Sequence, residues 1–458
     1  FIEGNSDLIK REYLKIIEKI GFLNIKGKKL HEVFELQSKF SFWWITDVYE
    51  KSLYKHLSIN EILKLIALEE VIKEQKIQKI SISNYDEKLF DSIKFICKKN
   101  QILFTGKNKK KKFKIFFVFK MIFVFLNFLR FLSKRFSFTK TNVKINNLKN
   151  LFCSYFAYIN LDKLNNNIYY SDYWRDLINQ KKIIKNSHFL HIFFPSKKIT
   201  FNDSIKAIKK VNKEENNLHF FVEEYFSIKI FFKIIFYWVR NILKFYSNRD
   251  KIKNSFFLSN LYSWYFLKDD LEESFCGISS LVNLYYFFLF KEISIRINSI
   301  DKTFFLYENQ GWEKSFVFNL RKLEKNKIYG IQHSTVRYWD LRYSINIDKS
   351  RKEIFNKFNP DYFVVNGEDS LKKMLNNSYP EEKIKKAEAI RYLDIIKSAK
   401  ADVLEKKNLN SILIVGDYAK QSNLNISNSL NQLDPIYFEK FNFTLKEHPL
   451  REMSNLLK

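Results

Sequence analysis

The sequence predicts an α/β fold of more than one domain. Short apolar runs alternate with amphipathic helical stretches along most of the chain, which is typical of strands and helices that pack in layers. Two of these runs, Thr303–Tyr307 and Lys327–Gln332, are followed at once by a carboxylate, Glu308, and an imidazole, His333. The 458 residues, 46% of them hydrophobic, exceed what one core usually organises, so two or three domains are expected.

The first 106 residues are expected to form a helical unit with a small α/β element. The run from Phe40 to Tyr49 is predicted to be helical, and its adjacent Trp43 and Trp44 are assigned to the core because they bury a large apolar area. Helices and strands then alternate, and their predicted ranges are Ile59–Gln75, Lys79–Ser83, Glu87–Lys99 and Gln101–Thr105.

Residues 107–150 are interpreted as a basic, membrane-associating insertion. A lysine-rich stretch at 107–112 precedes the apolar run Phe113–Leu132. This run is long enough to span a bilayer, but three basic residues interrupt it, and each costs about 2.5–3.5 kcal/mol near the bilayer centre. An interfacial helix avoids most of that cost, because its phenylalanines enter the acyl boundary while its lysines meet anionic headgroups.

A second stretch, Ile228–Tyr246, is similarly basic and rich in aromatic residues. Both stretches can instead be buried core helices whose lysines extend outward to solvent, and this alternative stays open. The net charge of +29 implies an anionic partner. An anionic membrane surface is expected rather than nucleic acid, because no zinc-finger, homeodomain or RNA-recognition signature accompanies the basic residues.

Residues 151–405 are expected to form a Rossmann-like domain that includes the second basic helix at 228–246. Helices are predicted at Asn202–Lys213 and over much of 270–296. The predicted strands are Leu151–Ile159, Ser187–Phe194, Leu218–Val222, Thr303–Tyr307, Lys327–Gln332 and Tyr362–Asn366. Gly367 follows the last of them, at a strand-to-helix turn where a residue without Cβ can adopt unusual backbone angles.

Residues 406–458 are expected to be the start of a second, incomplete α/β domain. They contain predicted strands at Ser411–Gly416 and Phe441–Leu445 and a helix at Leu424–Leu433. A nucleotide-binding domain of this kind needs several such repeats. The chain also begins with Phe1 and shows no signal peptide, which favours a fragment or a processed chain.

The chain shows no pattern typical of a metal site or of a bound cofactor. Its three cysteines are widely spaced and odd in number, which fits a reducing cytoplasm. His188 and His191 come closest to metal-ligand spacing, but they fall on opposite faces of a predicted strand. Neither a Gly-x-Gly-x-x-Gly loop, a Walker loop nor an Asp-x-Asp element is present.

Side chains that follow neighbouring parallel strands meet at one edge of the sheet, where ligands bind in open α/β folds. Glu308, Gln310 and His333 are therefore expected to lie close together. This arrangement is typical of an active site.

Several segments together resemble a bacterial family of surface-carbohydrate, O-antigen-related biosynthesis proteins regarded as GT-B-type glycosyltransferases. The resemblance covers residues from about 40 to the end, and the segments that carry it are Phe42–Lys51, Tyr307–Lys314, Gly330–Thr335, Tyr338–Tyr343 and Ala387–Tyr392. The closing Lys-Glu-His-Pro element, with His448 and Pro449, resembles the His-Pro motif of two-domain GT-B enzymes, including bacterial sialyltransferases, Kdo transferases and glycerol-phosphate polymerases.

The resemblance implies a GT-B-like fold, in which two Rossmann-like domains face a cleft, and a donor site in the C-terminal domain. His448 would then donate a hydrogen bond to the donor phosphate, and Pro449 would fix the turn that aims it. Arg342 and Arg391 are candidates for binding a carboxylate or phosphate, or are structural charges. The remaining candidates for contacts with substrate or donor are Gln310, Gln332, Gly367 and Gly416.

Inverting glycosyl transfer needs a base that takes a proton from the acceptor hydroxyl. Glu308 is predicted to be that base; its alternative role is to cap the following helix through the N-terminal amides. His333 is predicted to bind an acceptor or phosphate or to shuttle a proton, or else to be structural. Glu313 is expected to pair with a nearby lysine or arginine.

The sequence thus predicts a glycosyltransferase on the cytoplasmic face of a bacterial membrane. Its co-substrate would be a nucleotide-activated sugar, with a slight preference for a CMP-linked acidic sugar, and its acceptor a lipid-linked glycan. Two alternatives remain: a transferase of glycerol phosphate or another polyol phosphate, and a non-catalytic scaffold at the membrane surface.

Overall fold

The computed structural model forms two compact units, Phe1–Arg391 and Tyr392–Lys458. The residues that it describes are 1–56, 58–83, 86–106, 117–136, 148–157, 159–175, 177, 187–195, 199–214, 217–259, 261–345, 352–389, 410–417 and 420–447. Residues 1–391 form one unit, whereas the sequence divided them among three domains. The predicted boundary at residue 405 lies outside the described residues.

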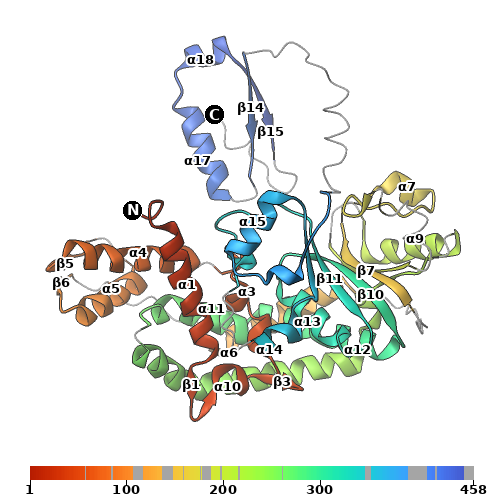
Figure 1. Ribbon diagram of the computed structural model, residues 1–458, viewed down its shortest axis with the longest axis horizontal. Helices are drawn as coiled ribbons and strands as arrows, with labels where there is room; N and C mark the ends of the chain where they lie inside the picture. The colour runs from red at the N-terminus through yellow and green to blue at the C-terminus, as the bar shows by residue number, and fades with distance from the viewer. Residues whose placement is uncertain are drawn as a thin grey trace. The chain divides into compact units, whose positions relative to one another are not determined.

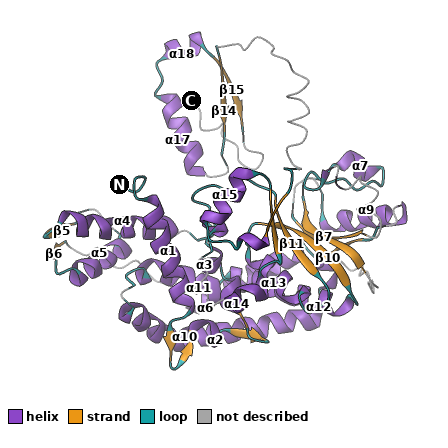
Figure 2. Ribbon diagram, viewed as in Figure 1, coloured by secondary structure: helices purple, strands orange, loops and turns teal. Residues whose placement is uncertain are grey.

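A seven-stranded sheet forms the centre of the first unit (Figures 1 and 2). All of its strand pairs are parallel, as the buried apolar runs predicted. In spatial order the strands are β13 (Ile384–Lys386), β12 (Tyr362–Val365), β11 (Lys327–Gln332), β10 (Ile300–Tyr307), β7 (Leu148–Phe156), β8 (Ser187–Phe193) and β9 (His219–Phe221). The predicted strands are confirmed, and β13 was not predicted.

The chain winds outward in both directions from the pair formed by β7 and β10. Strands β8 and β9 follow on one side of this pair, and β11, β12 and β13 follow on the other. The pair is therefore the topological switch point of the sheet, where the connections diverge and leave room above the carboxyl ends of the strands. In sheets of this type, ligands bind at that place.

Alternate residues of the strands face two hydrophobic cores. Leu151 and Phe305 belong to the larger core, which also contains α12 (Ile278–Arg296) and α13 (Gly311–Leu320). Phe152 and Phe189 belong to the smaller core, with α9 (Phe201–Glu214). Both faces of the β7–β8 part of the sheet are thus buried by helices, as a parallel sheet requires.

One helix within the described residues is long and apolar enough to cross a membrane by length and composition alone. This helix is α12, and 67% of its apolar window is buried. It packs against α10 (Ile228–Leu258), α11 (Trp264–Cys276) and α13. Core burial therefore accounts for its apolar character.

The N-terminal part of this unit combines helices with short strands. Two predicted helices are confirmed as α4 (Ile59–Gln75) and α5 (Glu87–Lys99), and β5 (Lys79–Ser81) pairs in parallel with β6 (Leu103–Thr105). The remaining elements here are α1 (Ser6–Gly21), β1 (Asn24–Ile25), β2 (Lys28–Lys29), α2 (Leu30–Val33) and β3 (Glu35–Gln37).

The run from Phe40 to Tyr49 is not one helix. It divides into β4 (Phe40–Ser41), the 3₁₀ helix η1 (Phe42–Ile45) and α3 (Asp47–Glu50). The hydroxyl of Thr46 accepts a hydrogen bond from the Tyr49 amide and donates one to the Trp43 carbonyl, which ends one helix and caps the next. Trp43 and Trp44 are buried, as predicted.

The two basic, aromatic-rich stretches are helical where the structure describes them. The first forms α6 (Phe117–Ser133), and residues 107–116 lie outside the described residues. The second forms the first part of α10, a helix of 31 residues that ends at Leu258. One side of each helix is buried, through Val124 and Phe128 in α6 and through Ile230 and other residues in α10.

The second unit contains the predicted strand pair. Here β14 (Ser411–Val415) pairs in parallel with β15 (Asn442–Lys446), and α17 (Lys420–Asn431) and α18 (Pro435–Lys440) lie between them in sequence. The helix α17 begins and ends earlier than the predicted range Leu424–Leu433.

Candidate functional site

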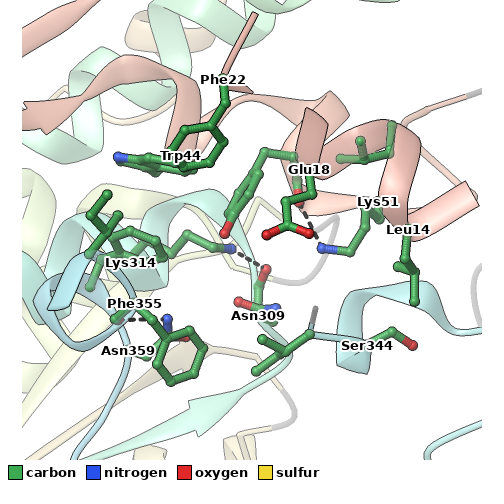
Figure 3. A pocket seen from close by; sticks show the side chains of 15 residues that line it. Leu14, Glu18, Phe22, Trp44, Lys51, Asn309, Lys314, Ser344, Phe355 and Asn359 are labelled. Carbon is green, nitrogen blue, oxygen red and sulfur yellow. Dashed lines mark hydrogen bonds between the residues drawn. The ribbon is translucent and has the colours of Figure 1, made fainter. Parts of the chain in front are cut away.

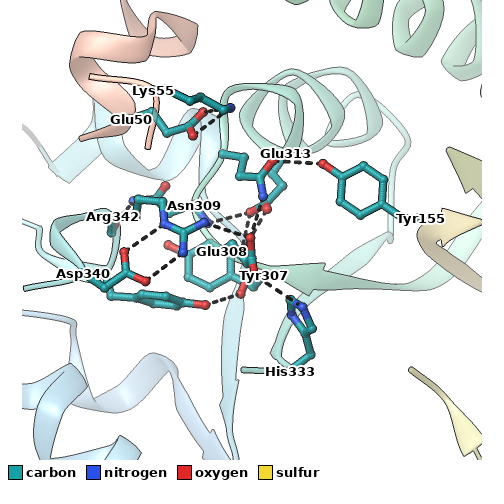
Figure 4. Close-up of polar contacts among 12 residues, drawn as sticks. Glu50, Lys55, Tyr155, Tyr307, Glu308, Asn309, Glu313, His333, Asp340 and Arg342 are labelled. Carbon is teal, nitrogen blue, oxygen red and sulfur yellow. Dashed lines mark hydrogen bonds and ion pairs between the residues drawn. The ribbon is translucent and has the colours of Figure 1, made fainter. Parts of the chain in front are cut away.

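Glu308 and His333 lie side by side at the carboxyl edge of the sheet. Each follows the last residue of its strand, and those last residues, Tyr307 and Gln332, are paired in the register of β10 and β11. His333 Nε2 lies 3.3 Å from Glu308 Oε1, and the ring of Tyr173 meets the imidazole edge to face. The predicted proximity of the two side chains is confirmed (Figure 4).

Arg342 completes an ionic cluster around Glu308. One Nη of its guanidinium lies 2.8 Å from Glu308 Oε2. Its Nε and other Nη each donate a 2.8 Å hydrogen bond to the carboxylate of Asp340. The guanidinium thus donates two hydrogen bonds to Asp340 and one to Glu308. Because these contacts lie within the protein, Arg342 positions Glu308 and does not present its two-pronged edge to a substrate anion.

Gln310 also helps to hold the Glu308 carboxylate in position. Its Nε2 donates a 2.6 Å hydrogen bond to Glu308 Oε2. Its Oε1 accepts hydrogen bonds from Tyr155 at 2.9 Å and from the indole of Trp312 at 3.0 Å. Since Tyr155 belongs to β7 and Gln310 follows β10, this amide bridges the switch point. The predicted substrate contact of Gln310 stays untested, and the structure assigns its amide to positioning.

The cluster keeps Glu308 ionised. Burial by itself would raise the pKa of this carboxyl. The charge of Arg342, the neighbouring imidazole of His333 and the hydrogen bonds from Gln310 and Arg342 outweigh burial, so the pKa of Glu308 lies below its ordinary value. Its side chain retains 20% exposure. A partly accessible, ionised carboxylate at this edge can accept a proton from a bound hydroxyl.

The turn after β10 is stabilised by two other carboxylates. Glu313 accepts hydrogen bonds from the backbone N–H groups of Glu308 and Asn309, at 2.8 to 3.1 Å. Glu50 accepts one from Gly311 at 3.0 Å, at the start of α13. The capping role considered for Glu308 is therefore performed by Glu50, which leaves the Glu308 carboxylate directed at Arg342 and His333.

The expected pairing of Glu313 with a basic side chain is wrong for the described residues, since none lies within ion-pair distance of it. The reason is its position: Glu313 lies behind the turn, fully buried, where the backbone supplies the donors. Burial, followed by the charge of Glu308, raises the pKa of Glu313 well above its usual range. Perturbed carboxyl groups gathered in one place are typical of functional sites.

Backbone geometry fixes the turn further. Asn309 adopts a left-handed conformation with φ +60°, which asparagine tolerates better than most residues. Its Nδ2 donates a 2.6 Å hydrogen bond to the Arg342 carbonyl, tying the turn to the segment that carries Arg342. At Gly311 an added Cβ would lie 2.7 Å from the Ile45 carbonyl oxygen, so only glycine allows this approach of the η1 segment.

Replacing Gly311 with Ala should destabilise the protein by about 1–3 kcal/mol, because the new Cβ must displace backbone rather than a flexible side chain. Urea unfolding of the purified variant measures this. Gly4→Ala is the matched control, since its nearest contact would be an ordinary 3.8 Å. A Gly311→Ala variant as stable as Gly4→Ala would contradict the close approach.

Gln332 and Gly367 organise the ends of β11 and β12. The Gln332 side chain donates hydrogen bonds to the Ser334 carbonyl and the Ser370 hydroxyl, at 2.7 and 2.9 Å, and it is buried. Its amide therefore supports the strand ends, and the predicted ligand contact finds no support in this geometry. Gly367 is the N-cap of α15 (Glu368–Asn376) with φ +117°, which confirms the predicted unusual turn.

The other predicted site residues belong to the end of the chain. Gly416 follows β14, and its N–H donates a 2.9 Å hydrogen bond to the Lys446 carbonyl, so this glycine extends the strand pair. Arg391, His448 and Pro449 lie outside the described residues. Their predicted roles at a donor phosphate remain predictions.

Four contributors to the site were missed by the sequence reasoning: Glu50, Lys55, Tyr155 and Asp340. Lys55 lies 2.8 Å from Glu50 Oε1 and lowers the pKa of Glu50 against the opposing effect of burial. Asp340 stands two residues before Arg342, which was a readable signal for an intramolecular pair. Nothing in the local sequence connects Glu50 with Gly311, 261 positions away.

Comparison of the chain with protein-family models and with curated proteins found no match. Within the described residues, no group of three or more histidine, cysteine, aspartate or glutamate side chains is arranged to hold a metal ion.

Proposed function

We propose that this protein is a glycosyltransferase of bacterial surface-polysaccharide biosynthesis. It transfers a sugar from a nucleotide-activated donor to a lipid-linked glycan acceptor, using a GT-B-like pair of domains. The observation that carries this proposal is the ionised Glu308, held by Arg342 and His333 at the switch point of a parallel sheet.

In the proposed reaction, Glu308 takes the proton of the acceptor hydroxyl as that oxygen attacks the anomeric carbon. The bond between this carbon and the donor phosphate breaks, and the nucleotide leaves with the bonding electrons. Arg342 keeps Glu308 ionised and fixed. His333 Nε2 lies 3.3 Å from the other carboxylate oxygen, Oε1, and in this proposal it binds the acceptor or shares the proton.

Donor specificity separates this proposal from a polyol-phosphate transferase. Membranes that contain the full-length protein should transfer label from CMP-sialic acid or a UDP-sugar to lipid-linked glycan and not from CDP-glycerol. Transfer from CDP-glycerol alone would replace the glycosyltransferase assignment with the polyol-phosphate one. No transfer from any donor would favour the scaffold.

The membrane part of the proposal rests on two exposed apolar stripes. On α10, Ile228, Phe232, Phe236 and Leu243 are 64–70% exposed, and together with Val239, which is 42% exposed, they recur every three or four residues along one face. On α6 the exposed members are Val118, Phe119, Ile122, Phe123 and Leu126. The ring of Phe117 contacts Tyr246, which joins the two helices.

The proposed occupant of these stripes is an anionic membrane surface on the cytoplasmic side. Lys229 and Lys233 lie exposed next to Ile228 and Phe232, so the apolar stripe is accompanied by positive charge. The chain as a whole carries +29. Apolar insertion combined with attraction to headgroups is the physical basis of interfacial helix binding. The enzyme would then lie next to a lipid-linked acceptor.

Replacing Phe232 and Phe236 together with Ser should weaken binding to anionic liposomes at least tenfold, since each buried phenylalanine contributes about 1.5–3 kcal/mol. Raised salt should weaken the remaining binding. Flotation of purified protein with vesicles measures both effects. Leu258→Ser is the control, because Leu258 is 87% exposed at the far end of α10. If both variants float with the vesicles to the same extent as the wild type, the apolar stripe of α10 does not contact the membrane.

A further inference from the structure

A small cavity lies beside the Glu308 cluster without including Glu308 or His333. It has a volume of about 60 Å³ and lies between α1, the segment from Trp44 to Lys51, the start of α13 and α14 (Lys352–Phe358). Its apolar walls are formed by Phe22, Trp44, Phe355 and Phe358, together with aliphatic residues of α1. Polar side chains from several elements also reach it (Figure 3).

Two lysines line this cavity, Lys51 and Lys314. Both are buried, with 6% and 2% of their surface exposed. Their amino groups point toward one another across the cavity (Figure 3). Each lies near the ring of Tyr49, at 5.0 Å for Lys51 and 5.6 Å for Lys314. Two ammonium groups that share one aromatic ring and one small space are an unusual use of buried charge.

Each amino group donates a hydrogen bond to a backbone carbonyl, and Glu18 is the acidic residue among those that line the cavity. Lys51 Nζ donates to the Tyr49 carbonyl at 3.1 Å, and Lys314 Nζ donates to the Asn309 carbonyl at 2.7 Å. Within the part of the chain that the structure describes, neither amino group lies within 4 Å of a carboxylate oxygen. An ammonium has three donors, so both groups retain capacity for a ligand.

We propose that this cavity binds a small oxyanion, either inorganic phosphate or a short carboxylate. The ligand's oxygens accept hydrogen bonds from Lys51 and Lys314, and its negative charge adds to that of Glu18 in offsetting the two buried amines. The volume limits the ligand to about four to six heavy atoms, given the room that a single water needs. A nucleotide or a sugar is too large. The proposal does not depend on the glycosyltransferase assignment.

The protonation of the two lysines supports this site. Burial, and then the nearby charge of Lys314, lowers the pKa of Lys51 to about 7. Burial lowers that of Lys314 to about 8. The charged groups that act on these two amines from the surrounding elements are Glu18, Glu50, Lys55, Glu313 and Arg342. A bound anion favours the protonated amines, so affinity is highest below pH 7 and falls as pH rises through 7 and 8.

Isothermal titration of the full chain with inorganic phosphate and with acetate, in 150 mM salt, tests the proposal. The expected result is one saturable site per chain at pH 6.5 for at least one of these anions, with affinity at least tenfold weaker at pH 9. Lys51→Met and Lys314→Met should each weaken binding at least tenfold. Lys64→Met is the matched control on an exposed helix face and should bind as the wild type does.

Two outcomes overturn the site. One is no saturable binding of phosphate or acetate to the wild type up to 10 mM at pH 6.5. The other is binding that survives in Lys51→Met and Lys314→Met as it does in Lys64→Met, which would place the anion elsewhere. Circular dichroism checks the fold of each variant. If either cavity variant is unfolded, the wild-type pH dependence decides, because affinity that does not fall between pH 6.5 and 9 is incompatible with amines of these pKa values.

Discussion

Glu308→Gln should lower kcat for sugar transfer by roughly 10²–10⁴-fold, the usual contribution of general-base catalysis. Glutamine keeps the shape of the side chain and can still accept a hydrogen bond from Arg342, but it cannot take up a proton. Single-turnover transfer with the donor that labels the acceptor measures the chemical step. Wild-type turnover in this variant would end the assignment of Glu308 as the base.

The matched measurement is the melting temperature of the same variant. Glu308 contacts Arg342, His333 and Gln310, so its loss also affects stability. A catalytic role predicts a fall in rate for fully folded protein, whereas a purely structural role predicts a lower melting temperature and a normal rate for the folded fraction. Glu308→Ala separates the two further, because it removes both the proton acceptor and the ion pair.

Arg342→Met should destabilise the protein by about 2–4 kcal/mol and move the acid limb of the activity profile to higher pH. Removing the guanidinium leaves Glu308 and Asp340 as neighbouring, largely buried carboxylates without their main partner. The pKa of Glu308 should then rise, because burial is no longer outweighed. Chemical unfolding at pH 7 and a rate profile from pH 4 to 8 measure the two effects.

The direction of the pH effect follows from the lowered pKa of Glu308 in the folded protein. The stability that its ionised form provides is fully present above the unfolded carboxyl pKa of about 4.3 and is lost as pH falls through the lower folded value. In Arg342→Met this loss begins at higher pH. Arg342→Lys should recover part of the stability, since it restores the charge without the fork. An unchanged acid limb in Arg342→Met would show that another group controls it.

The sequence predicted the sheet well because each buried strand is a short apolar run bounded by polar residues. The runs that became β7, β8, β10, β11 and β12 are of this kind. Placing Glu308 beside His333 needed only the rule that adjacent parallel strands end at the same edge. The helices α4 and α5 were predicted with their observed bounds, because their apolar spacing is regular and an Asp side chain caps α5.

Predictions failed where the hydrogen-bond partner of a side chain depends on the conformation of the nearby backbone. Glu313 was expected to meet a basic side chain, but the turn after β10 offers it backbone donors. The ligand contacts predicted for Gln310 and Gln332 stay predictions, and the amides of both side chains make hydrogen bonds within the fold. The run Phe40–Tyr49 was predicted to be one helix, but it divides at Thr46. The apolar residues around Thr46 favoured a continuous helix, and one hydroxyl group was too weak a signal to predict the break.

The position of β10 in the sheet has a consequence for the growing chain. Its partner β7 is synthesised roughly 150 residues earlier, and closing a loop of that length is slow compared with local folding. Until Ile300 and its neighbours leave the ribosome, β7 is the open edge of a three-stranded sheet formed with β8 and β9. Such an edge can pair with other nascent chains. Chains shortened before β10 should therefore aggregate during synthesis, whereas chains that include β10 can cover that edge and bring Tyr155 to Gln310.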